Sequence, residues 1–461
     1  MNPAFRHVHF IGICGTAMGA VAAAMRNQGY TVTGSDAGIY PPMSTFLESK
    51  GITLSEGYRA ENLPETADLI VVGNAISRGN PELEAVLNRK LYYLSLPETL
   101  KQFFLRGKHN LVVTGTHGKT TTTALLTWIM QSAGLNPAYM IGGIAKNLGQ
   151  GASLHESKYV TIEGDEYDTA FFDKRSKFVH YLPELVIVNN IEFDHADIFD
   201  SLDAIKISFR RLLNIVPEVG MVLINGDDPN CIDVAENCRA QLLEVGFSPN
   251  AARHIRDVSY DAHGSEFTLL DTRFRVPMVG EFNVRNAAMA ISAAHFYGVS
   301  LEAAARAVAE FGGVKRRQEV RGTVRGMTII DDFGHHPTAI AATLRGLRHQ
   351  YPGQRLWALF EPRSNTTRRA VFQQSLPEAL QEADGVILAQ VARIDQIDPA
   401  NRLDPERVVA DIVTAGREAY YEPDVDAIVT RLKPLVREGD VIVILSNGGF
   451  GGIHERLLKE L

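Results

Sequence analysis

Cysteine is scarce in this sequence, with only three in 461 residues. Cys14, Cys231 and Cys238 lack the spacing of a metal or redox motif, so we expect small, buried or half-buried side chains. No apolar run approaches the ~20 residues of a membrane-spanning helix, which predicts no membrane insertion. The N-terminal residues lead directly into a strand-like segment without the pattern of a signal peptide, so we expect a cytoplasmic protein.

An excess of basic residues is also lacking. The chain has 46 Lys and Arg against 54 Asp and Glu, a net charge of −8, which argues against general binding to nucleic acid or anionic membranes. Hydrophobic residues make up 45% and charged residues 22%, as in globular proteins. At ~150 residues per domain, the length predicts about three domains.

Among the features that the sequence does contain, the most informative is the segment Thr-Gly-Thr-His-Gly-Lys-Thr-Thr-Thr, residues 114–122. It lies between an apolar run at 111–113 and a helical pattern at 124–130, the layout of a loop that binds phosphate through backbone N–H groups. Val113 stands where the general motif has its first glycine, and the alternative is a simple turn that opens a helix. We predict a nucleotide site in which Lys119 reaches the outer phosphates and the Thr120 hydroxyl binds Mg²⁺.

Strand-like and helix-like segments alternate along most of the chain, which predicts an α/β fold with parallel sheets covered by helices. A polar, basic stretch at 101–110 is typical of a linker, and the glycines at 312–313 indicate a second boundary. Short alternating runs at 260–279 predict antiparallel strands. We therefore expect three domains, at residues 1–107, 108–313 and 314–461.

A second glycine-containing turn follows the first expected strand, at 7–11. Gly12 and Gly15 open a helix, and Asp36 ends the second strand, where an acidic residue can bind a ribose hydroxyl. The spacing differs from that of dinucleotide enzymes, and a glycine-rich turn with a solvated Asp is the alternative. We favour a site for a nucleotide diphosphate group.

Acidic residues follow two further expected strands. Glu163-Gly-Asp-Glu-Tyr-Asp168 comes after the strand at 159–162, and Asn189-Asn-Ile-Glu-Phe-Asp-His195 after the strand at 185–188. Residues just past the carboxyl ends of parallel strands face the ligand crevice, and Mg²⁺ prefers carboxylate oxygens. A solvated acidic turn is the alternative, but together the two segments predict a magnesium nucleotide crevice.

Four later segments also carry candidate residues. Asn283 could be a helix cap, whereas Asn286 lies one turn later and could contact a base. The cluster 315–317 could be ordinary surface charge, and the glycines at 448–452 could form a flexible loop. Acids and imidazoles at 331–336 follow an expected strand, where a core position is unfavourable for them.

These motifs, in this order, resemble those of the Mur ligases, the ATP-dependent enzymes that assemble peptidoglycan peptides. Gly115-Thr-His-Gly-Lys-Thr120 is similar to the family's phosphate loop, and the resemblance extends over essentially the whole chain. It implies an N-terminal Rossmann-like domain for a UDP-sugar, a central P-loop ATPase, and a C-terminal Rossmann-like domain for the incoming amine. ATP and Mg²⁺ are the implied cofactors.

Within the family, Gly12-x-x-Gly15-x-x-Met18 and Gly34-Ser-Asp36 resemble members that act on UDP-N-acetylmuramate. Two alternatives for the amine substrate remain open, L-alanine and the tripeptide L-alanyl-γ-D-glutamyl-meso-diaminopimelate. The runs at 163–178, 361–366 and 446–454 resemble the tripeptide-joining member, which serves peptidoglycan recycling. Formation of the amide through an acyl phosphate is the implied reaction, by a monomer or homodimer.

The resemblance also implies roles for individual residues. Catalysis is assigned to Lys119, His195, Arg317, His335 and His336. The nucleotide is assigned to Gly115, Thr116, His117, Gly118, Lys119, Thr120, Thr121, Asn286, Arg317, Asp331 and Asp332, and the metal to Thr120, Glu163 and His195. The two substrates are assigned to Gly12, Gly15, Met18, Ser35, Asp36, Asn74, Asp165, Tyr167, Arg363, Asn447 and Gly448.

Two residues depart from the family pattern. Arg210 stands where several relatives have a carbamylated lysine, so we do not invoke carbamylation, and Phe282 replaces a frequent histidine at the start of a helix. Two other classes of function stay open, a nucleotide-dependent binding switch that forms no bond and a dinucleotide oxidoreductase built on the Gly12 turn.

Overall fold

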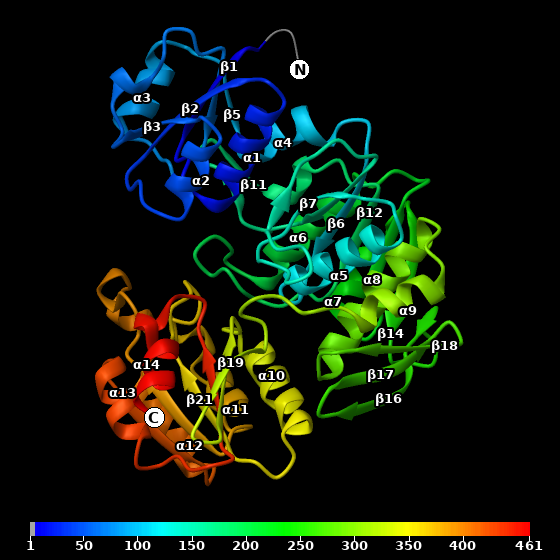
Figure 1. Ribbon diagram of the computed structural model, residues 1–461, viewed down its shortest axis with the longest axis vertical. Helices are drawn as coiled ribbons and strands as arrows, with labels where there is room; N and C mark the ends of the chain where they lie inside the picture. Colours follow the sequence, from blue (N-terminus) through cyan, green and yellow to red (C-terminus); the bar gives the residue numbers. More distant parts are fainter. Residues whose placement is uncertain (1–4) are drawn as a thin grey trace.

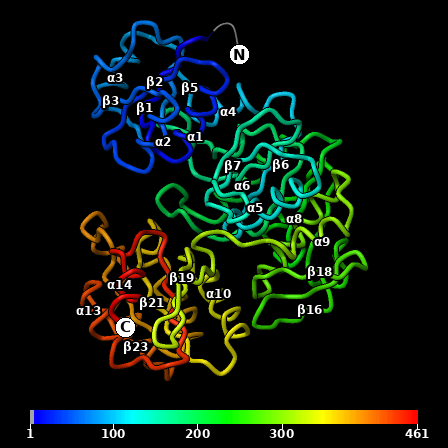
Figure 2. The backbone as a smooth tube through the Cα atoms, viewed as in Figure 1, coloured from blue at the N-terminus to red at the C-terminus, as the bar shows by residue number. Residues whose placement is uncertain are grey.

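A computed structural model describes residues 5–461 of the chain as three α/β units that follow one another along the sequence (Figures 1 and 2). The N-terminal unit contains a five-stranded parallel sheet in the order β3-β2-β1-β4-β5. Its strands are β1 His7–Ile11, β2 Thr31–Asp36, β3 Thr53–Glu56, β4 Leu69–Val72 and β5 Tyr93–Ser95. Its helices are α1 Thr16–Asn27, α2 Met43–Ser49, α3 Pro81–Asn88 and α4 Leu96–Leu100.

The central unit contains an eight-stranded sheet in the order β15-β14-β13-β12-β6-β9-β7-β8, parallel except for the β7–β8 pair. Its strands are β6 His109–Thr114, β7 Ala138–Met140, β8 Ala152–Ser153, β9 Tyr159–Glu163, β12 Leu185–Val188, β13 Met221–Asn225, β14 Gln241–Gly246 and β15 Arg253–His254. Its helices are α5 Lys119–Ser132, α6 Leu202–Leu213, α7 Pro229–Ala235, α8 Glu281–Phe296 and α9 Leu301–Ala309.

Two small antiparallel elements extend the central unit. The hairpin β10 Asp168–Ala170 and β11 Asp173–Ser176 reaches the N-terminal unit, where the Phe172 ring lies 5.2 Å from the Tyr93 ring. Strands β16 Arg256–Asp261, β17 Gly264–Leu269 and β18 Thr272–Val276 form a separate antiparallel sheet. The alternating pattern at 260–279 therefore predicted the strand type correctly.

The C-terminal unit contains a six-stranded sheet in the order β19-β20-β24-β21-β22-β23, in which β19 is antiparallel to its neighbour. Its strands are β19 Glu319–Val324, β20 Met327–Asp332, β21 Leu356–Phe360, β22 Gly385–Ala389, β23 Glu418–Glu422 and β24 Val441–Leu445. Its helices are α10 Pro337–Gln350, α11 Ser375–Leu380, α12 Pro405–Thr414, α13 Val425–Leu432 and α14 Ile453–Glu460. The predicted three-domain α/β class with mostly parallel sheets is confirmed.

The connections between the units differ from free linkers. Residues Lys101–Leu105 continue α4 as a helical turn, and Phe104 and Leu105 are buried in the core. The expected polar linker at 101–110 is therefore wrong at its start, because two large apolar side chains anchor it. The second connection is buried as well, since Val314 pairs with Ala145 in a β-bridge.

Each sheet brings candidate residues together at one edge. In the central sheet β6 lies between β12 and β9, so the segments after these three parallel strands meet at their carboxyl ends. The same holds for β2-β1-β4 in the N-terminal unit and for β20-β24-β21 in the C-terminal unit. Within residues 5–461, the helices are too short or too polar for any of them to be a membrane-spanning candidate.

Candidate active site

The loop between β6 and α5 requires glycine at two positions. Gly115 and Gly118 have φ angles of +127° and +78°, a region that L side chains rarely adopt. A Cβ at Gly118 would lie 2.5 Å from Asn286 Oδ1, and one at Gly115 would lie 3.0 Å from the backbone nitrogen of Asn190. The loop is therefore closely backed by α8 and by the segment after β12, and Asn286 lies directly behind it.

Lys119, the first residue of α5, is held inside this loop. Its Nζ donates to the carbonyl oxygen of Gly115 at 2.7 Å and to both carboxylate oxygens of Glu166 at 3.0 Å. Burial alone would lower the pKa of Lys119, but the nearby carboxylates, Glu166 first, outweigh it and the pKa is raised. Lys119 is therefore a fixed positive charge at the loop.

Glu166 connects the loop lysine to His195. Its Oε1 lies 2.8 Å from His195 Nε2, and the Tyr167 ring lies 4.2 Å from the imidazole. Burial alone would lower the pKa of His195, but the Glu166 carboxylate outweighs it and the pKa is raised. Burial would likewise raise the pKa of Glu166, yet Lys119 and His195 lower it. The three side chains form a Lys–Glu–His chain of charges.

A second acidic group lies on the other side of the loop. Glu163, at the end of β9, accepts from the Thr120 hydroxyl at 3.0 Å and from the backbone N–H of Gly142 at 2.7 Å. Arg317, from the C-terminal unit, reaches the same hydroxyl at 3.4 Å. Burial raises the pKa of Glu163, and the charges of Lys119 and Arg317 only partly offset this effect.

These residues fit a magnesium nucleotide. The Thr120 hydroxyl and the Glu163 carboxylate are the hard oxygen donors that Mg²⁺ prefers, and a side chain at Gly118 would fill the cradle. Asn189 Oδ1 is buried beside the loop and has no hydrogen-bond partner within the described residues. His195, predicted as a third metal ligand, points at Glu166.

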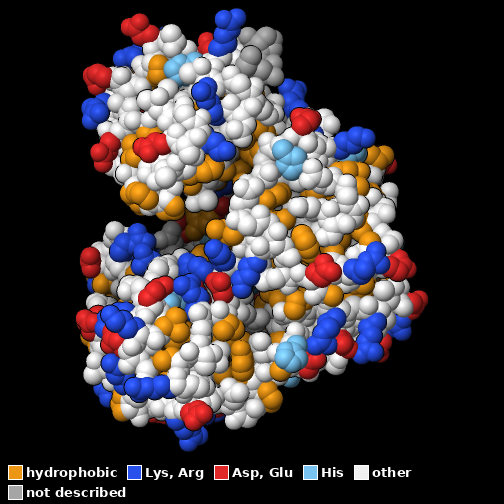
Figure 3. Space-filling model, in the orientation of Figure 1, with side chains coloured by type: hydrophobic (Ala, Val, Ile, Leu, Met, Phe, Trp, Pro, Cys, Tyr) orange, Lys and Arg blue, Asp and Glu red, His pale blue; other side chains and the backbone are white. Residues whose placement is uncertain are grey.

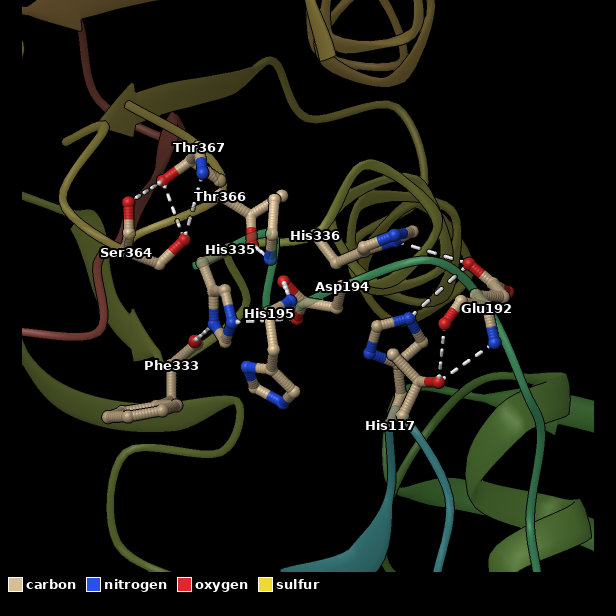
Figure 4. Close-up of polar contacts among 12 residues, drawn as sticks. His117, Glu192, Asp194, His195, Phe333, His335, His336, Ser364, Thr366 and Thr367 are labelled. Atoms are coloured by element: carbon tan, nitrogen blue, oxygen red, sulfur yellow. Dashed lines mark hydrogen bonds and ion pairs between the residues drawn. The ribbon is translucent and has the colours of Figure 1, made fainter. Parts of the chain in front are cut away.

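Five more polar residues meet between the central and C-terminal units (Figure 4). His117 Nε2 lies 3.4 Å and His336 Nδ1 3.2 Å from Glu192 Oε2, while His335 Nε2 lies 3.6 Å from Asp194 Oδ2. Burial, followed by the charge of His117, lowers the pKa of His336 to about 3. Burial would raise the pKa of Glu192, but the histidines and Thr338 lower it to about 2.

Hydrogen bonds close to this cluster also cross between the two units. The backbone N–H of Ala196 donates to Thr366 Oγ1 at 3.2 Å, and Asn365 Nδ2 donates to Asp197 Oδ2 at 2.7 Å. The segment after β12 is therefore attached to the loop after β21.

Asp331 and Asp332, which were assigned to the nucleotide, have other partners in the structure. The Asp331 carboxylate lies 3.1 Å from His454 Nε2 and 3.3 Å from Arg316 Nε. Asp332 accepts from the backbone N–H groups of Gln318 and Gly334 at 2.8 and 2.7 Å. Both carboxylates are buried, so these contacts organise the C-terminal unit itself.

The predicted sugar-binding residues meet at the edge of the N-terminal sheet. The backbone N–H groups of Gly12 and Ile13 donate to the Ser35 carbonyl, and that of Cys14 donates to Asp36 Oδ2 at 2.8 Å. Gly12 has φ +86°, as the tight turn requires. Met18, on α1, and Asn74, just after β4, belong to the same edge, together with Gly15.

Two further groups of predicted substrate residues are also placed. Asp165 is paired with Lys177 at 2.8 Å, next to the Tyr167 ring. Arg363 packs against Gly448, where a Cβ would lie 2.3 Å from Arg363 Cδ, and Asn447 Oδ1 is buried without a hydrogen-bond partner among the described residues. The loops after β21 and β24 are therefore in contact.

Sequence reasoning did not single out several residues that organise these sites. Glu166, Glu192 and Asp194 lie inside the two acidic segments that were identified. The acidic composition of these segments was the signal that could have pointed to the three residues. Glu82, at the start of α3, had no local signal. It is fully buried and accepts from the Ser35 hydroxyl at 2.8 Å and pairs with His9 at 2.7 Å.

A deep hollow separates the N-terminal and C-terminal units on the face shown in Figure 3, and Lys and Arg side chains gather along its lower edge. An edge of this charge suits anionic ligands such as phosphates and carboxylates.

Comparison with known proteins covers nearly the whole chain. Residues 7–108 match the Mur ligase family catalytic domain, residues 113–294 the Mur ligase middle domain, and residues 316–448 the Mur ligase glutamate ligase domain. The chain is 44% identical to a UDP-N-acetylmuramate–L-alanyl-γ-D-glutamyl-meso-2,6-diaminoheptandioate ligase of Haemophilus influenzae, covering 99% of each chain.

Two further similarities extend this comparison. The chain is 33% identical to a UDP-N-acetylmuramate–L-alanine ligase of a Psychrobacter species, covering 98% of this chain and 94% of the relative. It is similar to the crystal structure of a murein peptide ligase from Psychrobacter arcticus, with a TM-score of 0.72, 37% identity and 98% of each chain covered.

Proposed function

The chain belongs to the Mur ligase family, and from that premise we propose that it joins UDP-N-acetylmuramate to L-alanyl-γ-D-glutamyl-meso-diaminopimelate. The reaction forms an amide bond at the expense of ATP, as in peptidoglycan recycling. The observation that carries this proposal is the meeting of Lys119, Thr120 and Glu163 with Arg317, which arrives from a different unit.

The proposed division of labour follows the three units. Residues 1–107 bind the UDP-sugar, residues 108–313 bind ATP and Mg²⁺, and residues 314–461 bind the tripeptide. The contacts at Gly12 and Asp36 support the first assignment, and those around Arg363 and Gly448 support the third. The enzyme would act in the cytoplasm, where ATP is available.

When bound, Mg-ATP would supply the phosphoryl group that activates the sugar's lactyl carboxylate as an acyl phosphate, with ADP as the leaving group. The amine of the tripeptide's L-alanine would then attack the acyl carbon, displace inorganic phosphate and lose a proton to form the amide. Thr120 and Glu163 would hold the metal, with His195 nearby, and Asn286 would contact the adenine. Lys119 would leave Glu166 and turn toward the outer phosphates, which its position in the loop allows. Arg317 would neutralise charge on the phosphoryl group, because it already lies beside Thr120.

His335 and His336 would act on the amine side of the reaction. Burial, followed by the charge of His117, lowers the pKa of His336 to about 3, so its ring is neutral near pH ~7 but only a weak base, which makes His335 the better candidate to take the amine proton. Domain closure would bring the two substrates together and exclude water, which would otherwise hydrolyse the activated acid.

L-alanine addition is the second candidate, because the relative at 33% identity uses the same sugar nucleotide. The test offers purified protein UDP-N-acetylmuramate, Mg-ATP, and equal amounts of L-alanine and the tripeptide. We expect mass spectrometry to find the tripeptide adduct as the main product. A product carrying L-alanine alone would contradict the substrate assignment. Phosphate release without any new bond would instead indicate a binding switch.

A further inference from the structure

His117, Glu192 and His336 lie at a junction between two domains and outside the predicted magnesium site (Figure 4). His117 belongs to the phosphate loop, Glu192 follows β12, and His336 caps α10 of the C-terminal unit. One ligand-type atom from each residue lies within 4.8 Å of the other two. None of the three is among the residues assigned to Mg²⁺, namely Thr120, Glu163 and His195.

The hydrogen bonds of His336 fix which ring nitrogen carries the proton. Nε2 lies 3.2 Å from the carbonyl oxygen of Phe193, which can only accept, so Nε2 is the donor. Nδ1 accepts from the backbone N–H of Thr338 at 3.3 Å, as a helix-capping atom does. Nδ1 therefore presents a lone pair.

That lone pair faces a carboxylate oxygen. His336 Nδ1 lies 3.2 Å from Glu192 Oε2, so two acceptors are in contact, and the same Oε2 also accepts from the Thr338 hydroxyl at 2.7 Å. His117 Nε2 approaches the same oxygen at 3.4 Å, and the two imidazole rings are 4.4 Å apart. A cation bound between Nδ1 and Oε2 would replace this contact between two acceptors with two favourable ones.

The spacing suits a tetrahedral metal. Zinc binds imidazole nitrogen and carboxylate oxygen at about 2.0–2.2 Å, which separates two tetrahedral ligands by about 3.3–3.5 Å. The two contacts to Glu192 Oε2, at 3.4 and 3.2 Å, are close to this separation. Two imidazoles and one carboxylate favour a zinc-class ion over Mg²⁺, which prefers oxygen ligands.

We propose that His117, Glu192 and His336 form a site for one zinc-class divalent ion that links the phosphate loop to the C-terminal domain. The fourth position would be open to water, as in zinc sites with three protein ligands. On binding, the metal would take the Nδ1 lone pair that the long Thr338 hydrogen bond now shares. The ion would hold α10 against the central domain without occupying the magnesium site.

The test measures Zn²⁺ bound to the full-length protein by equilibrium dialysis, in excess Mg²⁺ and without nucleotide or substrates. We expect one Zn²⁺ per chain, lost in both Glu192→Gln and His336→Gln. Glu184→Gln is the matched control, because Glu184 also pairs with a histidine, His109, but has no second imidazole. The proposal would be overturned if both site variants kept Zn²⁺, or if Glu184→Gln lost it. It would also be overturned if the ion were lost in His335→Gln, the neighbouring histidine, instead of in the site variants.

A second measurement uses the unaltered chain, so it does not depend on how well a variant folds. Co²⁺ in a four-coordinate site with two imidazoles absorbs visible light strongly, whereas Co²⁺ bound by oxygen ligands in six-fold coordination absorbs weakly. We expect strong absorption that Zn²⁺ abolishes and Mg²⁺ leaves in place. Weak absorption, or displacement by Mg²⁺, would contradict the site. Neither measurement uses ligation, so failure here leaves the proposed reaction standing.

Discussion

Lys119 and Glu166 form an ion pair with Nζ and Oε2 3.0 Å apart, and their side chains are only 14% and 3% exposed. The charge of the lysine in the phosphate loop is therefore balanced by a carboxylate that follows the neighbouring strand, β9. Because Glu166 also contacts His195, movement of Lys119 toward phosphate would leave the Glu166–His195 pair in place. The arrangement keeps a buried positive charge paired in both states.

Replacing Lys119 with alanine should abolish ligation while leaving binding of the UDP-sugar largely intact. Loss of one charged group that stabilises the transferred phosphoryl group costs about 100-fold or more in kcat. Phosphate release reports the reaction, and calorimetry with UDP-N-acetylmuramate reports binding. Near-normal turnover would remove Lys119 from the reaction.

The pair between His195 and Glu166 should stabilise the fold more at acidic than at alkaline pH. The folded-state pKa of His195 is raised above 6.5. The contribution of the protonated ring to the free energy of unfolding is therefore complete below pH 6.5, and it disappears as the pH rises through the folded-state pKa. Urea unfolding of the wild type and of His195→Gln should therefore differ more at about pH 6 than at about pH 9. A difference that grows with pH would contradict the pairing.

Gly118→Ala should weaken ATP binding strongly, because its Cβ would meet Asn286 Oδ1 at 2.5 Å. Gly134→Ala is the matched control, since Gly134 has φ +83° and nothing within 4 Å of an added Cβ. Both variants carry a left-handed strain of about 1–2 kcal/mol. Nucleotide titration should separate them, and equal ATP affinity in the two would argue against the cradle.

Two adjacent arginines should affect different steps. Arg317→Ala should lower kcat by about 100-fold, because Arg317 reaches the Thr120 hydroxyl beside the phosphate loop. Arg316→Ala should mainly raise the KM for the tripeptide, because Arg316 donates to the carbonyls of Ser446 and Gly448 at 2.7 and 2.6 Å. Steady-state kinetics with each substrate varied in turn separates the effects, and identical profiles would count against the assignment.

Glu82→Ala should destabilise the N-terminal domain and weaken binding of the UDP-sugar. Removing one partner of a buried pair costs about 3–5 kcal/mol, and here His9 and Ser35 would each lose a buried contact with Glu82. Glu84→Ala, on the same helix, removes an exposed pair with Arg78 and should change stability little. Equal denaturant midpoints for the two variants would show that the buried network adds no stability.

Features encoded locally could be predicted from the sequence. The strands β1 and β12 have the bounds that the sequence predicted, 7–11 and 185–188, and the Gly-Lys-Thr segment marked the loop that leads into α5. The acidic segments after β9 and β12 were placed together because parallel strand ends meet at one edge of a sheet.

Features that depend on distant partners could not be predicted. Glu82 looks like an ordinary acid at the start of a helix, and only the fold brings His9 and Ser35 to it. Asp331 resembled a ligand-binding residue, but its partners Arg316, Arg321 and His454 come from other segments of the C-terminal unit. The contact between His117 and His336 exists only because two domains meet.

The central claim is that the sugar's carboxylate is activated in the crevice beside Lys119 and then captured by a peptide amine. The most direct test uses UDP-N-acetylmuramate whose lactyl carboxylate carries heavy oxygen, together with ATP and the tripeptide. An acyl phosphate transfers one carboxylate oxygen to the released phosphate, so we expect phosphate that carries one heavy oxygen in amounts equal to the amide formed. Amide formation with unlabelled phosphate would contradict the account.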